Sequence, residues 1–398
     1  MKKTFENLKN KPFFSLFKGM VVGVILSSCS TVAQPAQGAP LQEEGAKPTP
    51  PATELSVQAG AAASPATSVE PASPLPAETP PTSSPLVVQL ASYVPEEKPL
   101  PPPLEPLSFK EVWAYVQVGE EASFDPRWPV SDVALFSATI GNTGKLRGVP
   151  SRAKLSSFTG RVHLVVTELS NYALTHFCLS PDFPLRSQLI QDILEAAKDF
   201  DGIHIDFEAV LAEDKDHFIS FLGALKKGLG KKMLSVAVPA RARKTNEAYD
   251  YEQITPVVDK VMVMAYDEHW SGSQPGSVAS IEWCERVASY AMQTIGPAKL
   301  VMGLPFYGRA WGHINPSRAY RFSSLSKLME EKGITQKELR NGSNYFEYTE
   351  LVNVRVFYED HRTTHGRAAL YRQKGVNHIA FWRIGQEDQE IWKYLLVQ

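Results

Sequence analysis

The sequence predicts an α/β fold, a (β/α)8 barrel with an insertion after its seventh strand, preceded by a disordered tether rich in proline and alanine. Strand-like apolar segments recur eight times between residues 112 and 382, and helix candidates lie between several of them. Strands that alternate with helices build a parallel sheet, and eight such repeats in roughly 290 residues close the sheet into a barrel. Several strand candidates are nearly continuous apolar runs, as expected for parallel strands buried on both faces.

The first 28 residues have the features of an export signal. Five lysines lie within the first 18 residues, and the apolar run from Gly19 to Leu26 is too short to span a bilayer comfortably. Leu26-Ser27-Ser28-Cys29 resembles the lipobox of bacterial lipoproteins, which implies a lipid-modified N-terminus at Cys29. An ordinary signal peptide with an incidental cysteine is the alternative. Because lipid chains anchor a protein without a spanning helix, we expect an exported protein of the cell envelope, at the outer membrane or on the periplasmic side.

Residues 29–106 read as a linker that begins at the lipidated cysteine. Of the 30 prolines in the chain, 19 precede residue 107, and alanine, serine, threonine and glutamate fill much of the remainder. Such a composition cannot bury enough apolar surface to offset the entropy of ordering the chain. We therefore expect a signal peptide over 1–28, a disordered tether over 29–106 and a barrel domain over 107–398.

The barrel elements follow in order along residues 107–398. The strand candidates are 112–116, 132–136, 162–167, 203–208, 234–238, 260–266, 300–305 and 377–382. The helix candidates are 185–200, 216–229, 280–293 and 363–374. The stretch from Gly312 to Val356 is longer than an ordinary loop and contains the turn signal Asn341-Gly342, so it is expected to be an insertion after strand seven.

The fourth strand candidate alternates apolar and polar residues over its whole length. Successive side chains of a strand point to opposite faces. Its isoleucines and Phe207 therefore face the surrounding helices, and His204, Asp206 and Glu208 face the other way. Two carboxylates two residues apart on one face repel each other, which raises the pKa of one of them and makes it a candidate general acid. The alternative is a strand with a solvated polar face.

Acidic and aromatic residues gather where the predicted strands end, which is where barrel enzymes carry their active sites. The strand ends carry Asp206 and Glu208, Tyr266-Asp267-Glu268-His269-Trp270, Pro305-Phe306-Tyr307-Gly308-Arg309 and Trp382-Arg383. Aromatic rings stack on the apolar faces of sugar rings, and carboxylates bind sugar hydroxyls. A pair of acids in such a setting indicates glycosidic-bond chemistry.

Composition excludes several other classes. The net charge of −2 gives no basic footprint, so we expect no nucleic acid partner. The sequence has no zinc-ligand spacing and no nucleotide fingerprint, so we expect no metal and no cofactor. Three cysteines do not make a disulfide framework, and Cys178 and Cys284 are expected to be buried free thiols. We expect a monomer.

The globular part resembles glycoside hydrolase family 18, the family that includes chitinases. The segment 201–208 is similar to the family's DGxDxDxE signature, and Met264-Ala265-Tyr266-Asp267 to its strand-six MxYD motif. Gly303 to Gly308 and Phe381-Trp382 are similar to its strand-seven and strand-eight motifs. Residues 266–270 and 357–360 resemble the bacterial branch related to spore-cortex-lytic enzymes, which act on N-acetylglucosamine linkages of peptidoglycan.

The resemblance implies a role for each matching residue. Glu208 would protonate the leaving oxygen and later serve as base for water, while the substrate's own 2-acetamido oxygen attacks the sugar. Asp206 would orient that group, Tyr266 and Asp267 would hold it, and Trp382 would form the floor under the sugar. The implied partner is a glycan that contains N-acetylglucosamine, with peptidoglycan favoured over chitin-like oligomers and N-glycans. A lectin-like barrel that binds glycan without cutting it is the alternative function.

The sequence departs from the family signature at His204, which stands where the signature has an inner aspartate. A neutral imidazole there could join the hydrogen bonds around Asp206, and a charged one would depress the pKa of Asp206. The alternative is a satisfied core histidine. Tyr307 and Arg309 could contact sugar or close the rim. Trp270 and Trp311 could be sugar platforms or packing residues, and Trp113 and Tyr115 are expected in the core.

Overall fold

The computed structural model describes residues 102–312, 318–349 and 353–398. The expected signal peptide, Cys29 and the tether up to residue 101 lie outside the described residues. Within the described parts, none of the helices has the length and apolar character needed to cross a membrane.

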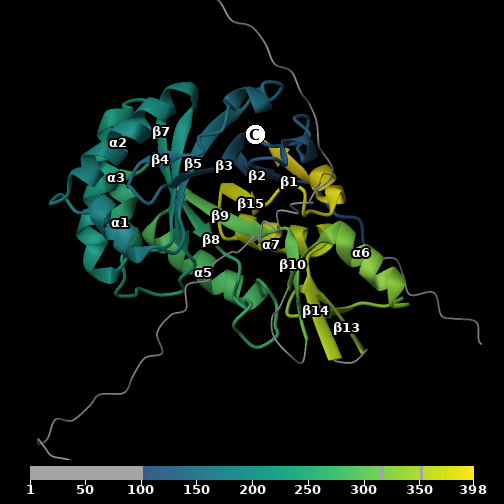
Figure 1. Ribbon diagram of the computed structural model, residues 1–398. Helices are drawn as coiled ribbons and strands as arrows, with labels where there is room; N and C mark the ends of the chain where they lie inside the picture. Colours follow the sequence, from purple (N-terminus) through teal and green to yellow (C-terminus); the bar gives the residue numbers. More distant parts are fainter. Residues whose placement is uncertain (1–101, 313–317, 350–352) are drawn as a thin grey trace, which may run out of the picture. The chain divides into compact units, whose positions relative to one another are not determined.

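Eight parallel strands close into a barrel, as the sequence predicts (Figure 1). Around the barrel they run β2-β15-β9-β8-β7-β6-β5-β3, and the pairing of β2 with β3 closes the ring. Their bounds are Glu111–Gln117 (β2), Asp132–Ile140 (β3), Arg161–Glu168 (β5), Gly202–Phe207 (β6), Met233–Pro239 (β7), Lys260–Met264 (β8), Leu300–Pro305 (β9) and His378–Trp382 (β15). All eight strand candidates are confirmed, and the short β4 (Leu146–Arg147) adds antiparallel to β3.

Helices cover the outside of the barrel, with α1 to α3 grouped on one side of it (Figure 1). They are Tyr172–Leu179 (α1), Pro184–Ala196 (α2), Lys215–Leu229 (α3), Tyr251–Ile254 (α4), Ile281–Thr294 (α5) and His361–Gln373 (α7). The sequence predicted α2, α3, α5 and α7 and missed α1 and α4. Both missed helices are short, and α1 has apolar residues on most of its surface, so neither shows a clear helical period.

The core has two layers that follow from strand alternation. Outward-facing residues such as Ile203, Ile205 and Phe207 pack under the helices, where Phe207 lies beside Phe218 and Phe221 of α3. Inward-facing residues form a second cluster inside the barrel, made of Trp113, Tyr115, Ala134, Val165, Met262, Val301 and Ala380. The barrel is therefore filled by side chains, and any chemistry has to lie at the strand ends.

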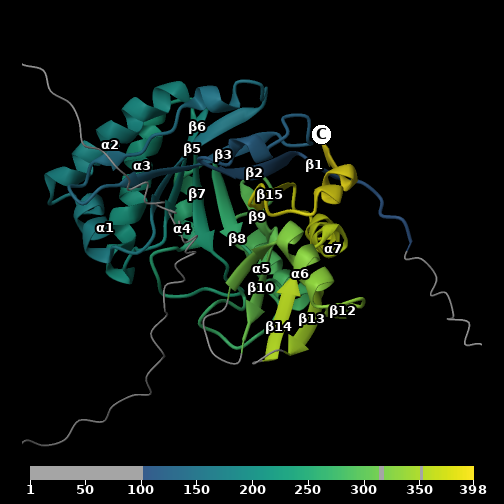
Figure 2. The same cartoon turned by 45° about the vertical axis from the view of Figure 1, so that its right-hand side comes forward.

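The insertion after β9 is a small domain of its own, seen beside the barrel in Figure 2. Its five-stranded sheet has the order β11-β10-β14-β13-β12, and helix α6 (Phe322–Glu331) packs on it. The strands are Tyr307–Trp311 (β10), Arg318–Arg321 (β11), Glu338–Arg340 (β12), Ser343–Thr349 (β13) and Asn353–Tyr358 (β14). The insertion begins at Tyr307, five residues before the predicted start at Gly312. Tyr307 to Trp311 form a strand that pairs with β14, which the sequence pattern did not indicate.

A buried ion pair joins the insertion to the barrel. Arg367 of α7 binds Glu359, which follows β14, and both side chains are almost fully buried. Arg367 also donates to Ser343 Oγ at 2.9 Å, at the start of β13. The strand that precedes the barrel and the last strand also meet, because β1 (Leu107–Phe109) pairs in parallel with β16 (Leu395–Val397).

Candidate active site

Strand β6 delivers two acids to the carboxyl end of the barrel. Asp206 lies within the strand and points inward, and Glu208 is the first residue after it. The backbone N–H of Glu208 donates to the carbonyl of Glu168 at 2.8 Å, so Glu208 stays in register with the end of β5. The predicted alternation is confirmed for the outward residues, since Ile203, Ile205 and Phe207 all lie in the outer core.

Glu208 is partly buried among other negative charges. Burial raises the pKa of its carboxyl well above the ordinary range, and the charges of Asp206 and Asp267 raise it further. Both charges favour the neutral form of Glu208 because like charges in a poorly solvated site cannot all be ionised. The site therefore keeps a proton on a carboxylic acid at neutral pH, which is what a general acid requires.

Asp206 lies deeper than Glu208, with only 4% of its surface exposed. Burial raises the pKa of its carboxyl as well. Among the described residues, nothing donates a hydrogen bond to its Oδ1. A buried carboxylate oxygen without a donor is costly, and it is open to receive an N–H or O–H group from a bound molecule.

His204 lies below Asp206 on the same face of β6 and is fully buried. Its Nδ1 meets Ser235 Oγ of β7 at 2.7 Å, and its Nε2 meets the Tyr115 hydroxyl of β2 at 2.7 Å. Burial and then the nearby His163 lower the pKa of His204 to about 3, so the ring is neutral near pH 7. With both ring nitrogens occupied, the structure favours the satisfied core histidine over a substrate contact, and an imidazolium that depresses the pKa of Asp206 is absent.

Asp267 follows β8 and is held by two residues of the insertion. The Tyr307 hydroxyl donates to Asp267 Oδ1 at 2.6 Å, and Arg309 Nη2 donates to the same oxygen at 2.9 Å. Asp267 has a φ of 59°, in the left-handed region that a residue other than glycine seldom adopts. The sequence allowed Tyr307 and Arg309 either to contact sugar or to close the rim. The structure shows both residues fixing Asp267 at the rim.

The aromatic candidates separate into two groups. Trp382 ends β15 and is partly buried, with its ring 5.1 Å from that of Tyr115 and 4.9 Å from that of Phe136. Trp382 therefore lies at the carboxyl end of the barrel, against the aromatic rings of Tyr115 and Phe136. Tyr266 follows β8, and its ring lies 6.4 Å from the ring of Tyr307. By contrast, Trp311 is buried in the insertion against Tyr345 and Phe357, so packing accounts for it.

The remaining residues after β8 hold the rim. The Trp311 indole donates to the carbonyl of Trp270 at 3.3 Å, and Trp270 itself stays partly exposed. Glu268 accepts from the Ser280 backbone at 2.7 Å, and His269 Nδ1 lies 2.7 Å from the carbonyl of Ser277. These contacts fix the loop that leads into α5.

Tyr115 was expected in the core, and Ser235 and Phe136 were not among the candidate residues. Together they form the support under Asp206 and Trp382, through the contacts of His204 and the aromatic rings. Tyr115 and Ser235 lie on inward-facing positions of their strands, which is the one sequence signal that could have identified them. Their pairing with His204 needed the barrel register, which brings Ser235 of β7 opposite His204 of β6.

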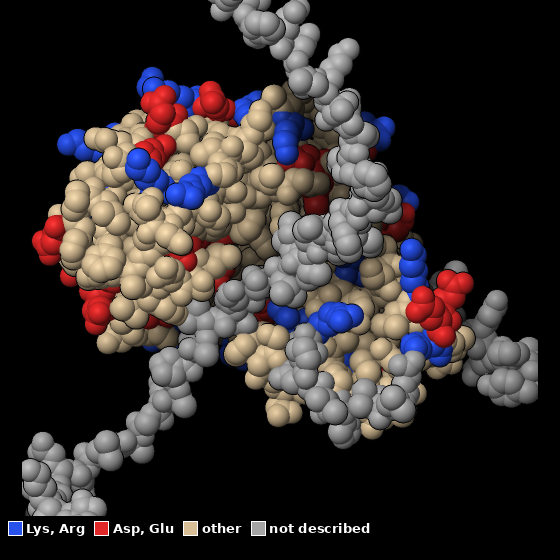
Figure 3. Space-filling model, in the orientation of Figure 1, with Lys and Arg blue, Asp and Glu red and all other residues tan. Residues whose placement is uncertain are grey.

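A hollow of about 900 Å3 lies elsewhere, between the loop after β2, helix α6 and the loop after β15. Trp128, Phe322 and Glu387 are among the residues that line it, and neither Asp206 nor Glu208 does. Acidic and basic side chains are interspersed on the face shown in Figure 3. The candidate active site is therefore assigned from the acids at the end of β6 and not from this hollow.

A sequence model of glycosyl hydrolases family 18 matches residues 184–387, just over half of the 398-residue chain. The chain belongs to this family. The matched range includes β6, β8, β9 and β15, which carry the four motifs on which the predicted membership depends. The predicted family and barrel are both confirmed.

Relatives of the chain are named as glycosylases or as cortical fragment-lytic enzymes. The uncharacterized glycosylase YvbX of Bacillus subtilis is 31% identical over 206 residues, which cover 48% of this chain and 59% of that protein. The cortical fragment-lytic enzyme of Bacillus anthracis is 27% identical over 289 residues, which cover 66% and 67%. The chain thus spans about half to two thirds of the length of these curated Bacillus relatives.

Solved structures agree on the fold. The Bacillus cereus spore cortex-lytic enzyme SleL superposes with a TM-score of 0.66 at 24% identity, over 74% of this chain and 75% of that one. A chitinase from Chromobacterium violaceum superposes with a TM-score of 0.65 at 25% identity, over 72% and 97%. Both likenesses cover the barrel and extend well beyond the range that the family model matches.

Proposed function

We propose that this chain hydrolyses β-1,4 bonds on the reducing side of N-acetylglucosamine, with Glu208 as general acid and then general base. One observation carries the proposal: Glu208 is partly buried beside Asp206 and Asp267, and its pKa is raised. A carboxyl that keeps its proton near neutral pH can protonate the leaving glycosidic oxygen, which contributes on the order of 10²–10⁴ in rate.

The nucleophile in this proposal is the substrate's own 2-acetamido oxygen, and the anomeric configuration is retained. Asp206 orients the acetamido group, and its Oδ1, which receives no donor among the described residues, accepts the acetamido N–H. As positive charge develops on the sugar, the ionised form of Asp206 becomes favourable. Glu208 then takes a proton from water, which opens the cyclic intermediate.

Tyr266 and Asp267 hold the acetamido group from the side of β8. Asp267 can do so because Tyr307 and Arg309 fix one of its oxygens. Trp382 supplies the floor under the distorted sugar, since its ring is held against Tyr115 and Phe136. Binding energy at these three residues positions the sugar for the internal attack. Trp270, partly exposed on the rim, is the candidate platform for a neighbouring sugar.

Peptidoglycan is the substrate that the comparisons support best. The cortical fragment-lytic enzyme of Bacillus anthracis aligns with two thirds of this chain, and the cortex-lytic enzyme of Bacillus cereus has the same barrel. Chitin-like oligomers come second, supported by the similarity to a chitinase. The two substrates share the N-acetylglucosamine unit that the mechanism requires.

The test compares the purified full chain with Glu208→Gln, which keeps the shape of the side chain and removes the proton. Each protein is incubated with peptidoglycan sacculi and with fluorogenic chitooligosaccharides. We expect release by the wild type and a loss of about 10²- to 10⁴-fold in the variant. Binding of both substrates by both proteins with release by neither would contradict the proposal and favour the lectin-like alternative.

The cellular location is a second part of the proposal and depends on the N-terminal sequence alone. Lipidation at Cys29 would anchor the chain in the cell envelope, and residues 29–106 would let the barrel reach the wall. Metabolic labelling with an alkynyl palmitate tests it in cells that express the full chain or Cys29→Ala. Label in the wild type and its loss in the variant is the expected result, and equal label in both would overturn the lipid anchor.

A further inference from the structure

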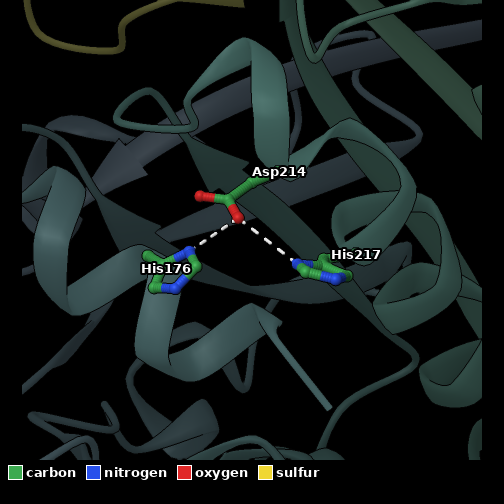
Figure 4. A group of neighbouring side chains, drawn as sticks. All are labelled: His176, Asp214 and His217. Carbon is green, nitrogen blue, oxygen red and sulfur yellow. Dashed lines mark hydrogen bonds and ion pairs between the residues drawn. The ribbon is translucent and has the colours of Figure 1, made fainter. Parts of the chain in front are cut away.

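Two histidines and an aspartate meet on the outside of the barrel, in the helix layer next to β6. His176 lies in the last turn of α1, Asp214 directly precedes α3 and His217 lies in its first turn. His176 Nδ1 is 2.7 Å from Asp214 Oδ1, and His217 Nδ1 is 3.3 Å from the same oxygen. Figure 4 shows both rings turned toward one carboxylate oxygen. The three ligand atoms all lie within 4.8 Å of one another.

Asp214 is unusual for a residue at this position. It is the N-cap residue of α3, yet its side chain accepts no hydrogen bond from the helix backbone. It is 1% exposed, and its Oδ2 finds no donor among the described residues. An aspartate at an N-cap normally satisfies the free N–H groups of the helix. A buried carboxylate without this capping role pays a desolvation cost, and its Oδ1, which both histidines face, is the oxygen that a bound cation would contact.

The two helices that carry the histidines are fixed to each other by a separate contact. Arg186 of α2 donates to the carbonyl of Leu179, at the end of α1, and to the carbonyl of His217 at 3.2 Å. The rings of Phe177 and Phe183 pack edge-on against His176. These contacts hold the three candidate ligands in place before any ion binds, which lowers the cost of ordering a site.

The site is also open to solvent on one side. The side chains of His176 and His217 are 37% and 34% exposed, whereas that of Asp214 is 2% exposed. A buried carboxylate behind two half-exposed imidazoles gives an ion an entry path and leaves room for a water ligand.

We propose that His176, Asp214 and His217 bind one divalent transition ion of the Zn2+ class. Imidazole nitrogen and carboxylate oxygen are ligands that Zn2+ prefers, at about 2.0–2.2 Å in a tetrahedron, which separates neighbouring ligand atoms by about 3.3 Å. The His217–Asp214 separation of 3.3 Å already matches. The His176–Asp214 separation of 2.7 Å has to widen by about 0.6 Å, which a small rotation of the exposed ring provides. Water completes the fourth position.

The ion has a structural task in this fold. Asp214 lies six residues after Glu208, so the ion ties the loop that leaves the catalytic strand to α1 and α3. It takes no part in the hydrolysis and provides no ligand position to the sugar. Its effect is expected in the stability of this corner of the barrel, and the inference stands independently of the proposed glycosidase activity.

The test measures binding of Zn2+ to the full chain after removal of metal with a chelator. Calorimetric titration is expected to give one ion per chain, and Co2+ as a probe is expected to give the visible absorption bands of a tetrahedral site. At a hundredfold excess over the dissociation constant, the melting temperature is expected to rise by about 5 °C. The variants are His176→Gln and His217→Gln, each expected to weaken binding by at least about 100-fold.

His361→Gln is the matched control. His361 also meets an aspartate through Nδ1, Asp388 Oδ2 at 2.6 Å, and no second histidine joins that pair among the described residues. Its replacement is expected to leave the stoichiometry and the affinity unchanged. The proposal is overturned if the folded wild type binds no ion, or if His176→Gln and His217→Gln bind Zn2+ as tightly as the wild type does.

Discussion

The two ends of the barrel carry similar acids under opposite conditions. At the carboxyl end, burial raises the pKa of Asp206 and Glu208. At the amino end, Asp132 starts β3 and is completely buried, and burial alone would raise its pKa as well. Hydrogen bonds from His163 and Arg161 outweigh burial and lower the pKa of Asp132 to about 2.

The difference lies in the partners that each acid has. Arg161 Nε is 2.6 Å and His163 Nε2 is 2.7 Å from Asp132 Oδ1. Glu111 at the same end contacts Arg161 at 2.9 Å and Lys260 at 3.0 Å, and its pKa is lowered although burial opposes this. The amino end thus pairs Asp132 and Glu111 with cations, whereas Asp206 and Glu208 at the carboxyl end have no such partner among the described residues. A barrel can place stabilising acids at one end and reactive acids at the other without any change of residue type.

Replacing Asp206 tests the reactive end and has the largest expected effect. Asp206→Asn removes the charge that favours the developing positive charge on the sugar, so kcat is expected to fall by about 100-fold or more. Initial rates on fluorogenic chitooligosaccharides measure it. Stability is expected to be equal or higher, because a carboxyl with a raised pKa loses stability as the pH rises above its unfolded pKa and asparagine does not titrate.

The outcome that would contradict this view is a strongly destabilised Asp206→Asn variant. A fall in the urea midpoint at pH 7 would mean that Asp206 is compensated in the fold, as Asp132 is. The midpoint of the wild type at the same pH is the reference.

Asp132→Asn tests the stabilising end and is the second largest effect. A folded pKa of about 2 against the ordinary 3.8 corresponds to about 2 kcal/mol of stability at neutral pH. Because the pKa is depressed, this stability is present above pH 4 and is lost as the pH falls toward 2. Urea unfolding at pH 7 is expected to show the loss, and at pH 3 a smaller one. Activity per folded molecule is expected to stay near that of the wild type, and a 100-fold loss of kcat would contradict the division between the two ends.

Of the two sets of acids, only those at the carboxyl end of the barrel could be predicted from the sequence. Alternation along 203–208 was enough to place Asp206 and Glu208 on the inner face, because a strand has a strict period of two. The eight apolar runs were enough to predict the barrel. Asp132 and Arg161 gave no signal, since each stands at the start of an apolar strand where a charged residue is usually solvated.

The residues that the sequence could not place depend on contacts between distant segments. Tyr307 and Arg309 were expected at the rim, and their common contact with Asp267 depends on β10, which begins at Tyr307. The partners of His204 come from β2 and β7, at separations of 89 and 31 residues. Register and closure of the barrel decide such contacts, and neither is visible in local periodicity.

Tyr307→Phe sharpens the account of how the reactive end is held. Loss of one hydrogen bond to the Asp267 carboxylate is expected to lower kcat/KM about tenfold, since a bond to a charged group contributes about 1.5–3 kcal/mol and Arg309 still holds the same oxygen. The matched control is Tyr345→Phe, whose hydroxyl also donates to a carboxylate, Glu347, within the insertion. Equal losses in the two variants would show that the insertion is disturbed as a whole and that the Asp267 contact is not specific.

His204 lies between the two ends, and replacing it is expected to have the smallest effect. With a pKa lowered to about 3, the imidazole is neutral over the working range, and its role is to join Tyr115 to Ser235. His204→Gln keeps a donor and an acceptor, so kcat is expected to stay within about threefold, and the acid limb of the pH–rate profile is expected not to move.

His204→Asp is the contrasting change, because a second carboxylate near Asp206 raises the pKa of Asp206 further. Activity that needs ionised Asp206 would then be lost at a higher pH than in the wild type. If His204→Gln moved the acid limb of the pH–rate profile as far as His204→Asp does, the neutral histidine would itself belong to the reactive carboxyl end of the barrel. The reactive end would then include the layer of inward-facing residues that contains His204.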